Sequence, residues 1–448
     1  MNHHLILKGI IISLLIYASS YAQTNTDQSN TDLGSPTFES TTQPFKVKGI
    51  HVTTWVVASP EQFKKIINLI RETELNTVVI DLKEVDGIIG YNANVSVARE
   101  IKAIQRRIKD INEIIALCDK YGIYKIARIT VFKDNHLATQ KPQLAIRDKS
   151  DNLWRDRKGQ SWVNPYLKEV WEYNIALAKD AVSYGFDEIQ FDYVRFPSYG
   201  KINNCWYGSE HSMQKAANAI IEFVKFVKQE LSSSAFLSVD VFGLITTCKD
   251  GMGIGQKFKE ISEYVDFISP MVYPSHYAKG SYGLNNPDAQ PYRTIFLSLR
   301  DAKQQIGNTK CKIRPWLQDF SLEYSYGANE VRYQIKAAYD QGLDEWLLWN
   351  PGCRYTKSAL LEEDEIKYIK QTSPKQIPAY KIETFHLLTE TLPLSYEYDS
   401  NIDKFEPIII VKDKLIATIK EEEKSSLKTS DVIYSIGVRI WDFLTQFV

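Results

Sequence analysis

The sequence lacks an excess of charge of either sign. Its 448 residues include 54 Lys and Arg against 55 Asp and Glu, which gives a formal net charge of −1. A protein that binds nucleic acid through its phosphates needs a basic excess, so we expect no nucleic-acid partner. The same balance gives no reason to expect attraction to an anionic membrane surface.

Histidine and paired cysteine are also scarce. Only seven His are present, and His51 stands alone where metal-dependent barrel hydrolases carry paired His. None of the five cysteines belongs to a CxxC pair, which argues against a structural zinc site. We therefore expect no metal and no other cofactor. Export would permit a disulfide between Cys205 and Cys248, but we expect free thiols.

No glycine-rich phosphate-binding motif follows the first apolar run. The segment HVTTWVVASPEQ contains no glycine, whereas a doubly wound nucleotide-binding sheet carries its signature at this point. Three glycines alternate in DGMGIGQ (250–256), but the rest of any nucleotide motif is missing. We expect this segment to be a flexible loop.

No apolar run is long enough to span a membrane comfortably. Lys8 precedes the short run GIIISLLIYA, and small residues end the stretch Ser20-Tyr21-Ala22, as in a cleaved secretory signal peptide. We predict a signal peptide over 1–22, no membrane span after its cleavage, and a secreted or periplasmic protein. An uncleaved anchor is the alternative. Residues 23–44 are polar and poor in aliphatic side chains, which predicts a disordered linker.

From Phe45 onward, strand-like runs alternate with segments of helical periodicity. Strands are predicted over 47–55, 76–83, 124–132, 187–194, 235–243, 265–273, 311–318 and 344–350, and helices over 59–74, 107–122, 166–185, 213–231, 292–307 and 328–342. This alternation predicts an α/β fold, a (β/α)8 TIM barrel over residues 45–371. A doubly wound open sheet is the alternative. Residues 372–448 form a small C-terminal extension to which we assign no role.

Alternation along each predicted strand separates side chains that face the helices from those that face the barrel interior. Ile189 and Phe191 face the helices, which turns Gln190 and Asp192 inward. The other inward sets are His51, Thr53 and Trp55; Val79, Asp81 and Lys83; Arg128 and Thr130; Ser238 and Asp240; and Arg314, Trp316 and Gln318. Their polar members gather near the C-terminal strand ends, where barrel active sites lie.

Carboxylates on neighbouring strands suggest glycoside hydrolysis, which needs two acids beside the scissile bond. Asp192 and Asp240 come from adjacent strands, which lie about 4.8 Å apart in a sheet. We take Asp192 as nucleophile or stabilising carboxylate and Asp240 as general acid/base. Arg128 and Arg195 are expected to keep Asp192 ionised. A purely structural pairing of Asp192 with an arginine is the alternative. The rival acids are Asp81, Glu84, Asp86 and Asp319.

Aromatic side chains are abundant after the strands, and rings that face a cleft can stack on sugars. The candidates are Trp154, Trp162, Tyr166, Tyr193, Trp206, Tyr273, Tyr277 and Trp349, with core packing as the alternative role. His276 could orient a substrate hydroxyl group. The full predicted substrate-binding set is Asp81, Glu84, Arg128, Trp162, Tyr193, Arg195, Tyr273, His276, Trp316, Asp319 and Trp349.

Several segments, taken together, resemble a known family. They are YKIARITVFKD, LAIRDKSDNLWRD, WVNPY, FDEIQFDYVRFPS, SVDVFG, EYVDFISPMVYPSHY, IRPWLQDF and WLLWNP. The set resembles a bacterial glycosyl hydrolase domain family, a barrel family first catalogued as a domain of unknown function and distantly related to the alpha-amylase clan. The resemblance covers most of the chain and implies a TIM barrel that hydrolyses glycosidic bonds.

The resemblance also implies roles for individual residues. The alpha-amylase clan ends its fourth strand with an Asp nucleophile, which matches Asp192, and its fifth with a Glu acid, where this sequence has the shorter Asp240. A further Asp ends the seventh strand, near Asp319. The clan's Arg two residues before the nucleophile is replaced by Gln190. The sequence thus predicts a secreted glycosidase acting on a poly- or oligosaccharide; a carbohydrate-binding barrel without catalysis is the alternative.

Overall fold

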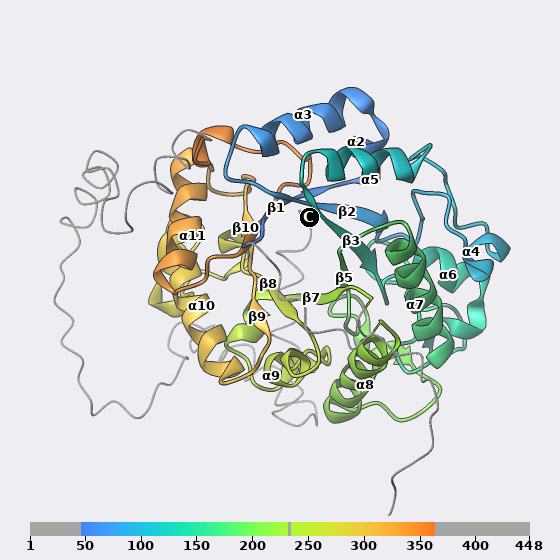
Figure 1. Cartoon of the computed structure of the whole chain (residues 1–448). Coiled ribbons are helices and arrows are strands. Elements are labelled where there is room, and N and C mark those ends of the chain that lie inside the picture. Colours follow the sequence, from blue (N-terminus) through green and yellow to red (C-terminus); the bar gives the residue numbers. More distant parts are fainter. Residues whose placement is uncertain (1–45, 232–233, 363–448) are drawn as a thin grey trace, which may run out of the picture. The chain divides into compact units, whose positions relative to one another are not determined.

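The computed structural model describes residues 46–231 and 234–362. The signal peptide predicted over 1–22, the linker over 23–44 and the extension over 372–448 lie outside these residues. Parallel strands close into a barrel with helices between them, so the predicted (β/α)8 TIM barrel is confirmed (Figure 1).

Eight strand positions make up the barrel, and each falls within a predicted run. The strands are β1 Lys48–Val52, β2 Thr77–Lys83, β3 Tyr124–Thr130, β5 Glu188–Asp192, β7 Phe236–Phe242, β8 Phe267–Met271, β9 Lys312–Ile313, β10 Trp316–Gln318 and β11 Trp346–Trp349. The short strands β9 and β10 share one position because Arg314 and Pro315 interrupt it. Pairing of β10 with both β8 and β11 closes the barrel.

The helices surround the strands, and Figure 1 shows most of them in a ring outside the barrel. Six match predicted segments: α3 Pro60–Arg71, α5 Ile111–Lys120, α7 Lys168–Ser183, α8 Met213–Leu231, α10 Pro291–Ile306 and α11 Ala328–Asp340. The short helices α2 Thr54–Ala58, α4 Ser96–Glu100, α6 Asn135–Gln140 and α9 Phe258–Ser262 were not predicted, because one turn or so is too short to show a hydrophobic period.

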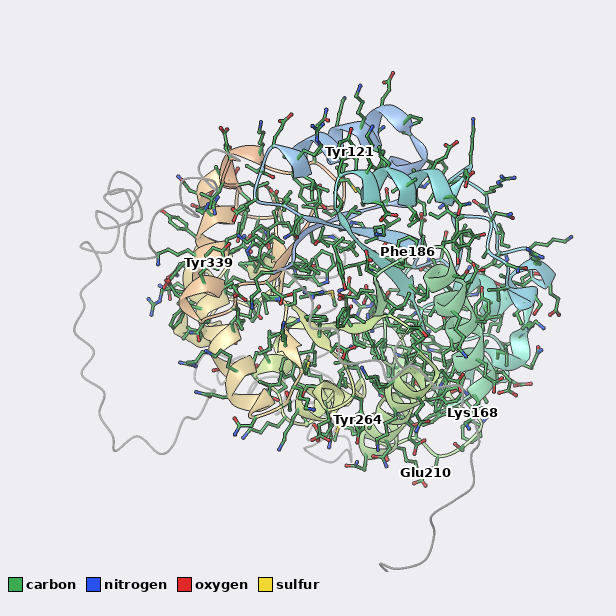
Figure 2. The ribbon with its side chains drawn as sticks, viewed as in Figure 1. Tyr121, Lys168, Phe186, Glu210, Tyr264 and Tyr339 are labelled. Atoms are coloured by element: carbon green, nitrogen blue, oxygen red, sulfur yellow. The ribbon has the colours of Figure 1, made fainter. Side chains whose placement is uncertain are left out.

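Two apolar layers hold the barrel together. The outer layer packs aliphatic faces of the strands against the helices; α3, for example, buries Phe63, Ile66 and Ile70 on one face. Figure 2 draws the side chains that fill this layer. A smaller inner cluster fills the barrel interior with Val47, Val79, Tyr124, Ile126, Tyr273, Trp316 and Leu347. The outer layer carries most of the buried apolar area and so dominates stability.

A register shift in β2 reverses one predicted orientation. Asp81 pairs with Arg128, but the next pair is Lys83 with Ile129, so one residue of β2 is skipped. Lys83 therefore does not point inward as expected. Its ammonium group donates to Asn174 Oδ1 on α7 (2.9 Å) and forms a buried ion pair with Asp134 (2.7 Å). The predicted inward orientation of Trp55 is also wrong, because β1 ends at Val52 and Trp55 lies on α2.

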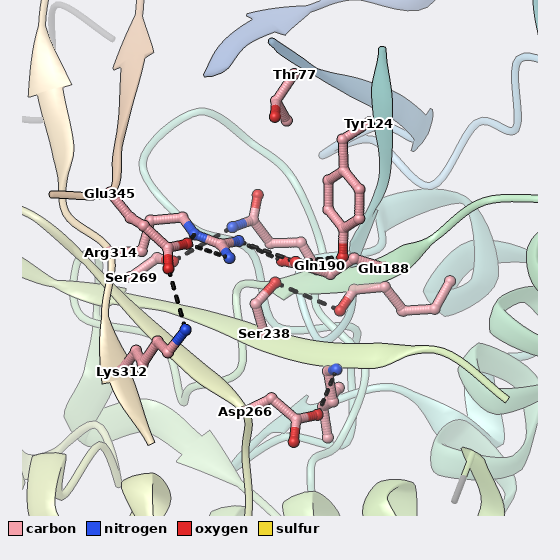
Figure 3. A network of polar contacts seen from close by, with 12 residues as sticks. Thr77, Tyr124, Glu188, Gln190, Ser238, Asp266, Ser269, Lys312, Arg314 and Glu345 are labelled. Carbon is pink, nitrogen blue, oxygen red and sulfur yellow. Dashed lines mark hydrogen bonds and ion pairs between the residues drawn. The ribbon is translucent and has the colours of Figure 1, made fainter. Parts of the chain in front are cut away.

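A buried network of charges closes the N-terminal end of the barrel (Figure 3). The Arg314 guanidinium donates to both oxygens of Glu188 (2.8 and 2.9 Å) and to Glu345 (2.9 Å). Arg314 and Glu188 have no exposed area, and Tyr124 adds a hydrogen bond to Glu188 (3.3 Å). This network lies opposite the strand ends where barrel active sites form, so we assign it a structural role.

The glycines of the 250–256 loop serve a tight turn rather than flexibility. Gly251, Gly253 and Gly255 all have positive φ (75°, 68° and 85°), and a Cβ at Gly255 would lie 2.8 Å from the carbonyl oxygen of Ala216. The turn buries Gln256, whose side chain accepts from the Phe242 amide and donates to the carbonyl oxygens of Val194 and Asp240. It therefore ties the ends of β5 and β7 together.

Two smaller observations complete the fold. All five cysteines are free thiols. None of the helices within the described residues has the length and apolar character needed to cross a membrane.

Candidate active site

A cavity of about 440 Å³ opens at the C-terminal ends of the barrel strands. Of the predicted site residues, it is lined by Asp81, Glu84, Arg128, Asp192, Tyr193, Arg195, Asp240, Tyr273, His276, Trp316 and Trp349. Trp162 and Asp319 do not line it. Side chains from strands around the whole barrel therefore meet at one place, as the position of barrel active sites requires.

Asp192 and Asp240 stand side by side at the cavity floor. Strands β5 and β7 pair in parallel, with Gln190 opposite Ser238 and Phe191 opposite Val239. The next inward residues are Asp192 and Asp240, which this register places at the same height along the barrel axis. Asp192 and Asp240 both contact the guanidinium group of Arg128. The predicted convergence of the two carboxyl groups is thus a feature of the structure.

Arg128 is the centre of the charged cluster. Its Nη1 donates to Asp81 Oδ1 (2.5 Å), its Nη2 donates to Asp192 Oδ2, and its Nε lies 3.7 Å from Asp240 Oδ2. Burial works against its charge, but the three carboxylates raise the pKa of Arg128 well above its ordinary value. A permanently charged guanidinium therefore lies among three acidic side chains from three strands and contacts each through a different nitrogen.

His51 extends the cluster on the side of β1. Its Nε2 lies 2.8 Å from Asp81 Oδ2, and its ring stacks on Trp349 with a centroid distance of 3.8 Å. Burial alone would raise the pKa of Asp81, but His51 and Arg128 lower it to about 2. Burial also opposes protonation of His51, yet the Asp81 carboxylate raises its pKa. Asp81 is therefore an ionised residue that positions its neighbours, and it is a poor proton donor.

Asp240 has the properties of a proton donor. It is 1% exposed, and its Oδ1 accepts a hydrogen bond from Trp316 Nε1 (2.8 Å). Burial, together with the neighbouring Asp192 carboxylate, raises the pKa of Asp240 well above its ordinary value, although Arg128 partly opposes the shift. Two carboxyl groups at adjacent positions, one of which has its pKa raised by its surroundings, are the arrangement that separates an acid from a base.

Asp192 ends β5, where the chain turns sharply. Tyr193 has φ of 52°, a left-handed conformation that is uncommon for a residue with a side chain. This turn brings the Tyr193 amide within 2.5 Å of Asp192 Oδ1. With Arg128 on Oδ2, both oxygens of Asp192 are held, so the carboxylate has one orientation toward the cavity.

Three more predicted residues line the cavity in defined states. Burial lowers the pKa of His276 to about 4, so its imidazole is neutral at physiological pH, and its Nδ1 lies 3.0 Å from Ser275 Oγ. Burial and the nearby aspartates raise the pKa of Tyr273 well above its ordinary value, which keeps its phenol protonated. Glu84 lies at the rim, where Arg107 Nη1 donates to it (2.7 Å).

Arg195 lies beside the carboxylates without bonding to them. Its Nη1 donates to the Phe196 carbonyl oxygen (3.1 Å) and to Ser198 Oγ (3.2 Å). Of the two arginines expected to act on Asp192, Arg128 therefore makes the ion pair and Arg195 does not.

Trp162 and Asp319 have other contacts. Trp162 is fully buried behind the cavity wall, where its ring meets Tyr193 edge-on at 5.7 Å and its Nε1 donates to Asp156. Asp319 accepts from the amide and hydroxyl of Thr356 (2.8 and 2.7 Å) and so holds the loop that follows β11. Asp319 directly follows Gln318, the last residue of β10, and its side chain lies outside the cavity.

Several cavity residues lie outside the predicted substrate-binding set. Trp55, which was placed in an inward set but given no role, is 64% exposed at the rim, and the Arg107 guanidinium stacks on its ring at 4.4 Å. Lys133 and Tyr199 also line the cavity, joined by a hydrogen bond of 2.9 Å. Lys133 falls just after β3 in the segment ITVFKD, and a count of charged residues directly after each predicted strand would have found it.

Among the described residues, no group of three or more His, Cys, Asp or Glu side chains is placed to hold a metal ion. At the cavity floor, the place between the three aspartates is taken by the Arg128 guanidinium.

Comparison with known proteins assigns the chain to a family. Residues 49–355 match the family described as "Putative glycosyl hydrolase domain". The chain belongs to this family. The resemblance read from the sequence motifs is thereby confirmed, and the matched segment contains every residue that lines the cavity. No curated protein matches the chain.

The chain is also similar to several solved structures. A hypothetical protein from Ruminiclostridium thermocellum ATCC 27405 is 34% identical over 43% of this chain and 97% of its own, with a TM-score of 0.39. The glycoside hydrolase domain of PgaB (BpsB) from Bordetella bronchiseptica is 11% identical over 71% of this chain and 99% of its own, with a TM-score of 0.54. An alpha-galactosidase from Thermus thermophilus covers 73% of this chain at 12% identity, with a TM-score of 0.46. The PgaB domain thus shares the barrel fold.

Proposed function

We propose that the protein is a retaining glycoside hydrolase that acts on an oligo- or polysaccharide outside the cytoplasm. The observation that carries the proposal is the level pairing of Asp192 and Asp240 at the floor of an open cavity. Membership of a glycosyl hydrolase family supports the reaction class. The aromatic side chains Trp55, Tyr273 and Trp349 along the cavity supply apolar faces suited to sugar rings.

The spacing of the two acids favours retention of anomeric configuration. Neighbouring strands lie about 4.8 Å apart, and Asp192 and Asp240 are level with each other. Retaining enzymes place their carboxyl groups about 5–5.5 Å apart, whereas inverting enzymes leave about 6.5–9.5 Å for a water molecule. Both carboxyl groups also lie beside one guanidinium, which keeps them on the same side of the cavity floor.

The first half of the reaction uses the two acids in opposite protonation states. An oxygen of the Asp192 carboxylate attacks the anomeric carbon and forms a glycosyl ester as the glycosidic C–O bond breaks. Asp240, which its raised pKa keeps protonated, gives its proton to the departing oxygen. When the ester forms, Asp192 loses its negative charge. Arg128 then still has Asp81 and the newly ionised Asp240 as partners.

The second half reverses the roles. The Asp240 carboxylate takes a proton from a water molecule whose oxygen attacks the anomeric carbon. The ester bond to Asp192 breaks, the sugar leaves with its original configuration, and both acids return to their starting states. Trp316 Nε1 stabilises the charged form of Asp240 through this interval with its hydrogen bond of 2.8 Å.

The proposal is tested with Asp192→Asn in the full chain, assayed on a panel of bacterial and plant glycans with product analysis. Turnover is expected to fall below detection. Asp187→Asn is the matched control, because Asp187 belongs to the same segment but bonds to Lys125 at the opposite end of the barrel. A mechanism-based fluorosugar should add its mass to the peptide that contains Asp192 in the wild type only.

Two outcomes would contradict the assignment. Equal turnover in the wild type and a folded Asp192→Asn variant would remove Asp192 as nucleophile. Tight glycan binding by the wild type with no product from any glycan would favour a carbohydrate-binding barrel without catalysis.

We also propose export, on the strength of the basic, apolar and small-residue pattern in residues 1–22. Expression of the full chain in a bacterial host with an active secretion system should yield a mature protein in the periplasm or medium that begins at Gln23. An intact N-terminus on the protein from the cytoplasm would overturn this proposal.

A further inference from the structure

Two buried cations line the same wall of the cavity. Lys133 follows β3 and Arg195 follows β5, and they are only 4% and 3% exposed. Exposed Lys158 extends the positive wall toward solvent. Glu84 follows the adjacent strand β2, and its charge is already balanced by Arg107.

Among the described residues, neither buried cation has a carboxylate partner. Within residues 46–231 and 234–362, no acidic oxygen lies within 4.0 Å of Lys133 Nζ or of the Arg195 guanidinium, whereas Lys83, Arg128 and Arg314 all have such partners. Lys133 donates to Tyr199 instead, and Arg195 to a carbonyl oxygen and a serine.

The nearest carboxylates are engaged elsewhere. Asp192 bonds to Arg128, and Asp156 accepts from Trp162 Nε1 (3.1 Å) and from the amides of Lys158 and Gln160. Both raise the pKa of Arg195 from a distance, but burial outweighs them and lowers it. The charge on this wall is therefore only partly compensated.

Aromatic rings hold the two cations in place. The Arg195 guanidinium lies 4.7 Å from the Tyr193 ring, 5.0 Å from the Trp162 ring and 4.3 Å from the Phe242 ring. Lys133 Nζ lies 5.2 Å from the Tyr193 ring and 5.7 Å from the Tyr199 ring. Such contacts offset part of the cost of burying a cation, and they fix its position facing the cavity.

We propose that Lys133 and Arg195 form a subsite for an anionic substituent, so that the substrate is an acidic saccharide carrying a carboxylate, or a sulfate or phosphate ester. Arginine and lysine on one wall are the side chains that recognise such groups, Arg195 through its planar fork and Lys133 as a point charge. The anionic substituent would supply the negative charge that the described carboxylates do not supply to Lys133 and Arg195. This inference rests on the proposed function, because it names the substrate class of the same cavity.

The inference is tested by binding, separately from turnover. The full chain carrying Asp192→Asn is titrated by calorimetry with oligogalacturonate, oligoalginate and chondroitin sulfate fragments, and with the carboxyl-reduced or desulfated form of each. At least one acidic probe is expected to bind tenfold or more tightly than its neutral form, with affinity that falls as salt rises. Comparison of each chondroitin sulfate fragment with its desulfated form, which keeps the carboxylates, distinguishes the two kinds of anion.

Variants assign the preference to the two cations. Lys133→Met and Arg195→Gln, added together, should reduce the acidic-to-neutral affinity ratio to about one. Lys125→Met is the matched control, because Lys125 has Asp119 and Asp187 as partners at the other end of the barrel, and it should leave the ratio unchanged. If the double variant does not fold, Lys133→Arg with Arg195→Lys keeps both charges and should keep the preference.

Each result decides one way. Equal affinity for acidic and neutral forms, binding of no acidic probe, or a preference that survives in the double variant would overturn the anionic subsite. Turnover of neutral glycans by the wild type together with equal affinities would leave the proposed hydrolase and remove the subsite. An acidic preference with no turnover of any glycan would leave the subsite and remove the proposed hydrolase.

Discussion

Arg128 on β3 is the register partner of Gln190 on β5. Two residues before Asp192 the chain carries Gln190, which brings no charge to the carboxylate. The guanidinium that bonds to Asp192 comes from the neighbouring strand at the same level of the barrel. One strand can thus supply the counterion for a carboxylate on the next, because inward residues of neighbouring strands face the same space.

Replacement of Arg128 should leave the buried carboxylates of Asp81 and Asp192 without the arginine that they share. In Arg128→Met, the free energy of unfolding at pH 7 is expected to fall by about 3–5 kcal/mol, since a broken buried ion pair leaves charges without a partner. Urea denaturation measures this loss. Arg300→Met, which removes a half-exposed pair with Asp301, should cost less than about 1 kcal/mol.

The same variant carries a pH signature. Asp81 has its pKa lowered from 3.8 to about 2, so its contribution to stability is present above pH 3.8 and is lost as pH falls toward 2. The stability difference between wild type and Arg128→Met should shrink over this range. A difference that stays constant from pH 7 to pH 2 would show that Arg128 acts through packing.

The raised pKa of Asp240 predicts the shape of the pH–rate profile. The general acid must be protonated, so kcat/KM should fall as pH rises through the pKa of Asp240, which lies well above 3.8. Asp240→Asn should lower kcat about 10²–10⁴-fold for glycosides with poor leaving groups and remove this basic limb. A basic limb that persists in Asp240→Asn would assign the acid to another residue, with Glu84 the first to examine.

Asp240→Asn should also change stability in a definite direction. A folded-state pKa above the unfolded value means that stability is lost as pH rises from 3.8 through the raised pKa. The amide cannot ionise, so the variant is expected to equal or exceed the wild-type melting temperature at pH 8 and to show less advantage at pH 4. Calorimetry at both pH values measures the melting temperature of the variant minus that of the wild type. A smaller difference at pH 8 than at pH 4 would contradict the prediction.

Trp55 should contribute to substrate binding without contributing to the fold. Its ring is 64% exposed at the cavity rim, and Arg107 covers one face. Trp55→Ala is expected to raise KM about tenfold, which corresponds to about 1.4 kcal/mol, with kcat nearly unchanged. Trp206→Ala, at another exposed tryptophan that does not line the cavity, should change neither constant. Equal effects of the two substitutions would remove Trp55 from the substrate path.

The N-terminal network predicts a loss of stability that is separable from activity. Arg314→Met leaves Glu188 buried without a counterion and Glu345 with only Lys312, and it should cost about 3–5 kcal/mol of unfolding free energy. Activity per folded molecule should stay near the wild-type value, because the cavity lies at the other end of the barrel. Loss of activity in a fully folded variant would contradict this separation.

The alternation of side chains was enough to predict the strands and the meeting of Asp192, Asp240, Asp81 and Arg128 in one cavity. In a barrel, every second residue of a strand faces the interior and the others face the helices. It failed where local geometry breaks the period. The register shift after Asp81 turns Lys83 outward, and the early end of β1 places Trp55 on a helix.

Other features depend on contacts that no single segment encodes. Glu188 and Arg314 are 126 residues apart, and each reads as an ordinary polar residue near the start of a strand. The loop contact of Asp319 with Thr356 likewise depends on where the chain returns after β11. Strand register, which gave Arg128 its position beside Gln190, is set by packing of the whole barrel.

The sealed N-terminal end has a consequence for how a long glycan is processed. With Glu188, Arg314 and Glu345 filling that end, the barrel offers no passage through which a polymer could be threaded. A glycan must therefore approach, bind and leave on the C-terminal face, and all its contacts with the barrel are confined to the cavity and the loops around it.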